Sequence, residues 1–168
     1  MGADELLDEE AFDPKKLEDE NEYVTLLVNR DGFRKKQNAA ADLMEALLEK
    51  NITRLEQETI FSELKKTNSQ KSLIDFLKDL KDNPAKAKIC AACWESCLDF
   101  TNDFLFFVEL SCHEDFQVSL EALTVVENIE SVLDEKTLTQ ALEIAQNSKG
   151  ANKINVEALI ENIKLRLS

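Results

Sequence analysis

Apolar residues recur at every third or fourth position from about residue 36 to the end of this 168-residue chain. That spacing matches the 3.6-residue period of an α-helix and gives each segment one apolar face. Only three glycines and two prolines occur, and a β-rich chain needs more of both for its turns. The sequence therefore predicts an all-α fold. Helices are expected near residues 36–50, 53–66, 70–81, 83–98 (with Asn83 as its cap), 101–112 and 115–130, then one closed by Gly150 and one ending near Leu167.

The start of the chain differs in composition, since the first 22 residues carry ten acidic side chains and two lysines. We expect residues 1–11 to form a mobile acidic lead-in and residues 12–168 to form one helical domain. Asp13 and Pro14 are typical of a helix start, but residues 23–28 have the composition of a strand, and both readings of 12–32 stay open. The lead-in either folds onto a basic partner or serves as a solvating tail.

The charge of the chain bears on its partners. A net charge of −14 repels phosphate backbones, which argues against nucleic-acid binding. The short basic cluster is interpreted as a solvated helix flank; it consists of Arg30, Arg34, Lys35 and Lys36. The first residues lack a secretory signal, and no apolar stretch approaches the roughly 18 residues of a membrane span. We expect a cytoplasmic protein with reduced cysteines and no membrane association.

Residues 70–98 align with residues 101–129 at an offset of 31, and their apolar positions coincide. The aligned pairs include Leu73 with Phe104, Phe76 with Phe107, and Ala91 with Ala122. Helical hairpins at this spacing are typical of an α-solenoid, in which each hairpin buries its apolar face against its neighbours. Two unrelated amphipathic hairpins of similar length would also align in this way. The fold prediction is therefore stacked antiparallel hairpins, with an irregular helical bundle as the alternative.

The run EDFQVSLEALTVV resembles the second helix of a HEAT-type repeat, through Asp115, Val118, Ala122 and Leu123. The run DNPAKAKICAACW is similar to it more loosely, with Asp82 and Ala92 in comparable positions, and Ser119 departs from the basic residue usual in the motif. The resemblance covers about residues 70–130. It implies a short right-handed α-α superhelix that binds proteins, often through its concave face.

Four cysteines offer one chemical alternative. Cys90, Cys93 and Cys97 share a helix, and Cys112 precedes the single histidine, His113. Thiolates and an imidazole suit zinc or an iron–sulfur cluster, which would make the chain a metal or redox sensor. Ligands spaced along one straight helix do not converge, however, so we interpret these thiols as small core residues. Adjacent helical residues also diverge by about 100°, so Cys112 and His113 do not form a catalytic pair, and His113 is expected in a turn.

The helix expected at residues 101–112 is apolar in nearly every direction, which requires cover on all sides. Phe106 and Leu110 align with the polar residues Asp75 and Asp79 of the preceding hairpin. This mismatch marks Phe106 and Leu110 as candidate contacts for a protein partner or a second copy of the chain. Trp94 is expected in the core.

No glycine-rich phosphate loop, calcium-loop spacing or placed nucleophile appears. We therefore expect no enzyme, no cofactor and no catalytic residues. The function that we infer from the sequence is a non-catalytic protein-interaction or scaffold module, with the metal or redox sensor as the alternative.

Overall fold

The computed structural model describes residues 39–149 and 151–168, and these residues form helices and connections without a strand. The all-α prediction is confirmed for this part of the chain. The acidic lead-in, the helix or strand expected at 12–32, the basic cluster and Gly150 lie outside the described residues. The described α-helices are α2 (Ala39–Leu47), α3 (Arg54–Lys66), α4 (Gln70–Asp79), α5 (Asn83–Glu95), α6 (Phe104–Ser111), α7 (Phe116–Asn128), α8 (Glu135–Asn147) and α9 (Lys153–Leu167), and a 3-10 turn, Thr101–Asp103, precedes α6.

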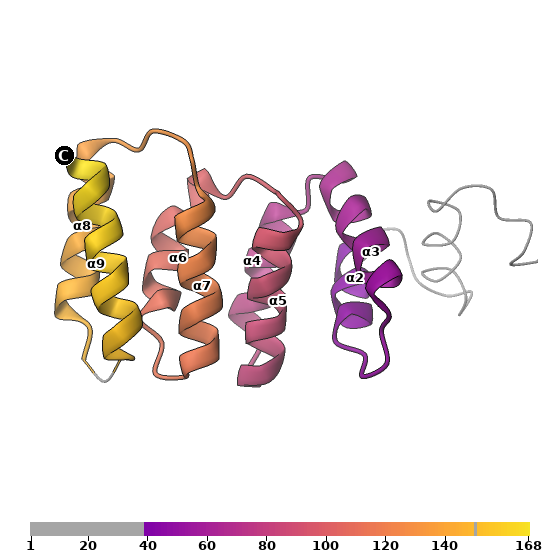
Figure 1. Cartoon of the computed structure of the whole chain (residues 1–168). Coiled ribbons are helices and arrows are strands. Elements are labelled where there is room, and N and C mark those ends of the chain that lie inside the picture. The colour runs from indigo at the N-terminus through magenta and orange to yellow at the C-terminus, as the bar shows by residue number, and fades with distance from the viewer. Residues whose placement is uncertain (1–38, 150) are drawn as a thin grey trace, which may run out of the picture.

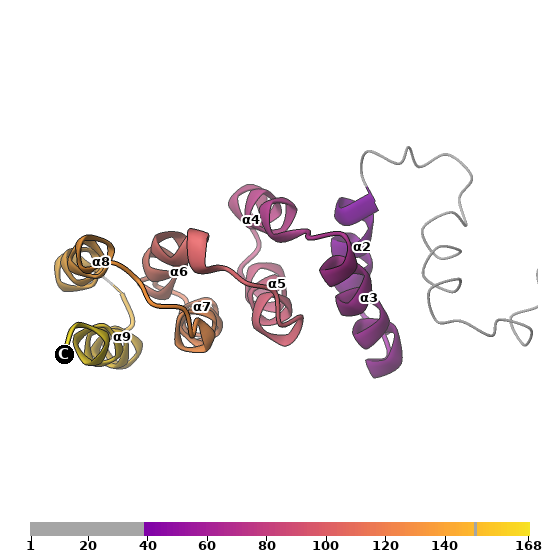
Figure 2. The ribbon, with the colours of Figure 1, turned by 90° about the horizontal axis from the view of Figure 1, so that it is seen from above.

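The helices stand side by side as consecutive pairs, α2/α3, α4/α5, α6/α7 and α8/α9 (Figure 1). The connections within pairs lie at one end of the array and those between pairs at the other, so successive helices run in opposite directions. Seen from above, α4, α6 and α8 form one row, and α5, α7 and α9 form a second (Figure 2). The most extensive interface joins α5 to α7, followed by α6 to α7. Each pair therefore packs mainly on the pairs beside it in sequence.

Aspartates cap the amino ends of three of these helices. The carboxylates of Asp82, Asp115 and Asp134 accept hydrogen bonds from the backbone N–H three residues on, at 2.9, 3.0 and 2.8 Å. Such caps satisfy N–H groups that have no partner within the helix. The cap predicted at Asn83 is wrong, because Asn83 is already the first helical residue and Asp82 caps α5. Both residue types cap well, so the sequence did not separate them.

Some helices end earlier than their apolar pattern predicts. α5 stops at Glu95 rather than near Leu98, because Cys97 has a φ of 53°. A left-handed residue just past a helix is a common stop signal, but it is usually a glycine. The sequence signal was therefore absent here. The ends predicted near Cys112 and Glu130 also extend slightly beyond the observed ends of α6 and α7.

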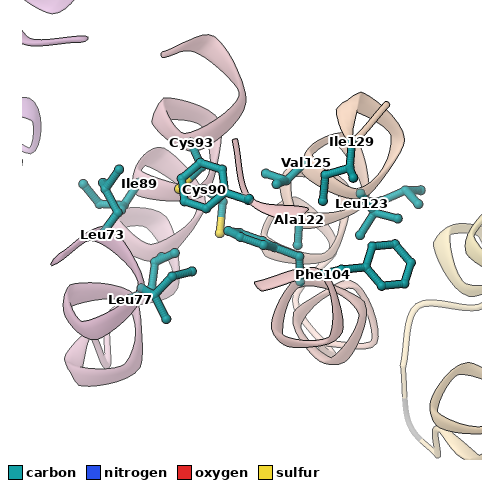
Figure 3. Packing of buried hydrophobic residues seen from close by; sticks show 14 of the residues in the cluster. Leu73, Leu77, Ile89, Cys90, Cys93, Phe104, Ala122, Leu123, Val125 and Ile129 are labelled. Carbon is teal, nitrogen blue, oxygen red and sulfur yellow. The ribbon is translucent and has the colours of Figure 1, made fainter. Parts of the chain in front are cut away.

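The core runs continuously from pair to pair, and α6 lies near its centre. Phe104, Phe107 and Val108 are buried, and α6 packs against α7, α8 and α9. The ring of Phe107 meets Phe100 edge to face, with centroids 5.2 Å apart. Figure 3 shows buried residues of α4 and α5 facing those of the α6/α7 pair. The cover predicted for the apolar helix thus comes from its own partner α7 and from the last pair, α8/α9.

None of the helices in the described ranges combines the length and the apolar character that a membrane span needs.

Candidate functional site

Phe106 and Leu110 lie one turn apart on α6, and both are partly buried against the core. The ring of Phe106 packs edge to face on Phe107, with centroids 5.3 Å apart. The ammonium of Lys78 lies 5.5 Å from the centre of the Phe106 ring, which is within cation–π range. Phe106 is therefore covered in part by the core and by α4. The two residues predicted as partner contacts share a surface of α6, but Phe107 and Lys78 already cover part of it.

The cysteines occupy different environments along α5 and α6. Cys90 and Cys93 are fully buried, and Cys112 is half-buried at the end of α6. The core interpretation thus holds for Cys90 and Cys93. For Cys97 it is wrong, because the helix ends before it and its side chain is exposed. Burial raises the pKa of Cys90 to about 12, and it also raises the pKa of Cys93.

These four thiols are not brought together as a ligand set. Within residues 39–149 and 151–168, no three His, Cys, Asp or Glu side chains are arranged to hold a metal ion. His113 lies in the connection between α6 and α7, as predicted, and its Nδ1 accepts a hydrogen bond from the backbone N–H of Asp115 at 3.0 Å. The imidazole therefore supports the turn rather than a neighbouring thiol.

A polar bridge that the sequence did not predict joins α5 and α7. The indole Nε1 of Trp94 donates a hydrogen bond to Glu121 Oε2 at 2.9 Å. Gln117, one turn earlier on α7, donates from Nε2 to Glu121 Oε1 at 2.6 Å. Trp94 is half-buried and does pack against the core, as predicted, but its polar edge reaches across to the next pair. The bridge fixes both the indole ring and the carboxylate.

A groove of about 390 Å³ lies beside this bridge, between the N-terminal halves of α5 and α7. Small side chains leave the space open on the α5 side, because Ala87 and Ala91 lie one turn apart on the same face. Glu121 forms part of the opposite wall. The complete lining consists of Pro84, Ala87, Lys88, Ala91, Asp115, Gln117 and Glu121.

The groove carries negative charge at the end near Trp94. Glu95 follows Ala91 by one helical turn, and its pKa is raised by burial and by the charge of Glu121, while Arg54 lowers it. Arg54 itself pairs with Glu58 at 2.9 Å. Among the described residues, no basic side chain forms an ion pair with Glu95 or Glu121 within 4 Å. Two carboxylates thus repel each other beside an apolar floor.

One sequence signal could have indicated this face. Gln117, Glu121, Thr124 and Asn128 form a polar stripe at helical spacing on an otherwise apolar segment. That stripe identifies the solvent side of α7. It does not indicate that α5 presents small residues opposite, because the relative placement of two hairpins is a property of the folded core.

A second hollow lies along α8 and is lined only by polar side chains: Asp134, Glu135, Lys136, Thr139, Gln140 and Glu143. It is an open surface, and the apolar area that it contains belongs to the stems of these polar side chains. Its composition is that expected of a solvated helix face.

No protein-family model matches the chain, and neither the curated proteins nor the solved structures gave a significant match.

Proposed function

We propose that this chain is a non-catalytic protein-interaction or scaffold module built from HEAT-like helical hairpins. The observation that carries the proposal is the groove shared by α5 and α7, which has an apolar floor and a polar wall, and whose Glu121 accepts a hydrogen bond from Trp94. Grooves with a largely apolar lining and a few placed polar groups are typical of binding sites.

The HEAT-like part of the proposal draws on the residues of α7. Asp115 caps the helix through the N–H of Val118, and Val118, Ala122 and Leu123 are buried. These are the positions that carry the resemblance. The second helices α5, α7 and α9 lie in one row (Figure 2), which is compatible with the proposed right-handed α-α superhelix. In such a superhelix we expect the second helices of successive pairs to share a binding face.

The proposal favours the α5/α7 groove over Phe106 and Leu110 as the partner contact. Phe106 already packs on Phe107 and beneath Lys78, so less of its ring is free for a partner. Ala91 lies on the groove floor and is only partly buried. A larger side chain at that position would fill the groove without displacing the core.

The test compares variants in capture from a native lysate, read by quantitative mass spectrometry. Ala91→Met fills the groove without changing charge, and Gln146→Met adds the same side chain at an exposed site on α8. The double variant Phe106→Ser/Leu110→Ser removes the alternative face. We expect proteins retained by the wild type and by Gln146→Met to be lost by Ala91→Met.

Each other outcome has a defined meaning. Loss only in the Phe106→Ser/Leu110→Ser variant would move the binding face to α6 and leave the interaction function standing. Retention of nothing above a blank resin, or retention of the same proteins by all variants, would refute the interaction function itself. Circular dichroism of each variant checks that the helices are intact.

A further inference from the structure

Among the residues that the structure describes, no basic side chain forms an ion pair with the two carboxylates beside the α5/α7 groove, those of Glu95 and Glu121. Arg54 approaches from α3 but pairs with Glu58 at 2.9 Å. Lys88 lies in the groove wall, and its Nζ donates to the carbonyl of Glu49 at 3.3 Å, in the connection after α2. Both Arg54 and Lys88 are therefore engaged with other acceptors.

Glu121 retains capacity for a further donor. Its oxygens accept one hydrogen bond each, from Trp94 and from Gln117. A carboxylate offers about four acceptor sites. The two existing donors also hold the carboxylate in one orientation, which reduces the entropy lost when a further donor binds.

The groove floor suits the stem of a long basic side chain. Ala87 and Ala91 provide an apolar track, and the indole of Trp94, three residues after Ala91, donates to Glu121 in the facing wall. Lysine and arginine side chains bury their methylene stems on apolar surface while their charged ends stay with polar groups. Arginine also stacks favourably on tryptophan and contacts a carboxylate with two donors.

We propose that the groove between α5 and α7 binds an arginine- or lysine-containing segment of a partner protein. The stem of the basic side chain lies over Ala91, and its charged end contacts Glu121 and Glu95. This inference rests on the proposed interaction function and specifies the chemistry of the partner. Charge complementarity selects this occupant, because the chain carries a net charge of −14 and its first 22 residues are strongly acidic. A second copy or the acidic lead-in would bring like charge to the groove.

The test measures binding of a fluorescein-labelled arginine-containing peptide in a Gly-Ser background to the full chain by fluorescence anisotropy. A matched peptide carries citrulline, which keeps the shape of arginine but lacks its charge. Glu121→Gln removes one groove charge and retains an acceptor for Trp94. Glu143→Gln removes the same charge from the polar face of α8.

We expect the arginine peptide to bind the wild type and the citrulline peptide to bind at least about ten-fold more weakly. Glu121→Gln is expected to weaken the arginine peptide by about ten-fold, and Glu143→Gln by less than about two-fold. Ala91→Met should block the peptide. Equal weakening by Glu121→Gln and Glu143→Gln would indicate general attraction to an acidic protein and would overturn the proposal.

Two further outcomes separate this inference from the proposed function. Groove-dependent capture of proteins, without binding of the arginine peptide, would overturn the basic-segment inference and leave the interaction function intact. Tighter binding by about ten-fold or more after changing Arg34, Lys35 and Lys36 to Gln would mean that this chain's own basic residues compete for the groove. That result would overturn the assignment to an outside partner.

Discussion

Arg166 on α9 joins the last helical pair to the carboxyl end of α7. Its Nη1 donates to the carbonyl of Ile129 at 2.7 Å, and its Nη2 donates to the carbonyl of Val126 at 2.9 Å. The last carbonyls of a helix lack the backbone donors of a following turn, and that of Val126 accepts only a long hydrogen bond from the N–H of Ile129, at 3.3 Å. The guanidinium adds donors to these carbonyls and complements the helix dipole. The guanidinium also lies 6.0 Å from the centre of the Phe104 ring. Replacing Arg166 with Met keeps an aliphatic stem and removes all of these contacts.

The expected loss follows from the two hydrogen bonds. A hydrogen bond to a charged group contributes about 1.5 kcal/mol at the low end of its range, which gives about 3 kcal/mol for the pair. Arg166 is only partly buried, so water can hydrate the released carbonyls and reduce this figure. We expect Arg166→Met to lower the free energy of unfolding by about 2 kcal/mol, and the midpoint of thermal unfolding by roughly 4–8 °C. Arg166→Lys keeps the charge but not the forked geometry, and should cost about half as much.

The assay is urea unfolding followed by far-UV circular dichroism. Lys164→Met is the matched control, because it removes the same charge from an exposed position on α9. The control is expected to change stability by less than about 0.5 kcal/mol. Amide hydrogen exchange adds a local readout, since in a linear array the loss should loosen α9 more than α4. If Arg166→Met were no more destabilising than Lys164→Met, the hydrogen bonds to α7 would not hold the last pair in place, and the reasoning would be refuted.

The burial of side chains gives four further predictions. In the native protein Cys97 should react rapidly with a thiol reagent, whereas Cys90 and Cys93 should react only on unfolding, which mass spectrometry of labelled peptides measures. Burial raises the pKa of Cys90 from 9.0 to about 12, so the thiol of the unfolded chain loses its proton at a lower pH than that of the folded chain. Between these two pH values the free energy of unfolding should therefore fall, by up to about 1.4 kcal/mol per pH unit. The variant Cys90→Ala should reduce this slope. Phe107→Ala, at a fully buried site, should lower the free energy of unfolding in urea by about 3–5 kcal/mol. Asn155→Ala removes a buried donor and should lower it by about 1–3 kcal/mol. Values near zero for either variant would contradict the packing described.

The helices could be predicted from the sequence because their signals are local. The apolar period and the capping residues depend on neighbours within a few positions, and the observed helices follow them closely. The exposed position of Cys97 could not be predicted, because a non-glycine residue in the left-handed region ends α5 there. Helix periodicity continued past that point and suggested burial.

The groove depends on contacts that the sequence does not encode locally. Trp94 and Glu121 are 27 positions apart, and their hydrogen bond exists only because α5 and α7 pack as neighbours. The sequence did mark α6 as central, but it drew attention to Phe106, whose ring the fold partly covers. Apolar composition identifies residues that must be buried, but it does not indicate which neighbouring helix buries them.

Hydrogen bonds from α9 hold α7 in position, and α7 forms one wall of the groove. Asn155 of α9 donates to the hydroxyl of Ser119 at 3.1 Å, near the amino end of α7, and the Ser119 hydroxyl donates to the carbonyl of Ser111 at 2.6 Å. At the other end of α7, Arg166 holds the carbonyls of Val126 and Ile129. Both ends of α7 are thus fixed to the last pair by buried or partly buried polar contacts, which are directional where apolar packing is not. The last pair therefore acts as the support of the groove, although none of the groove-lining side chains belongs to α9.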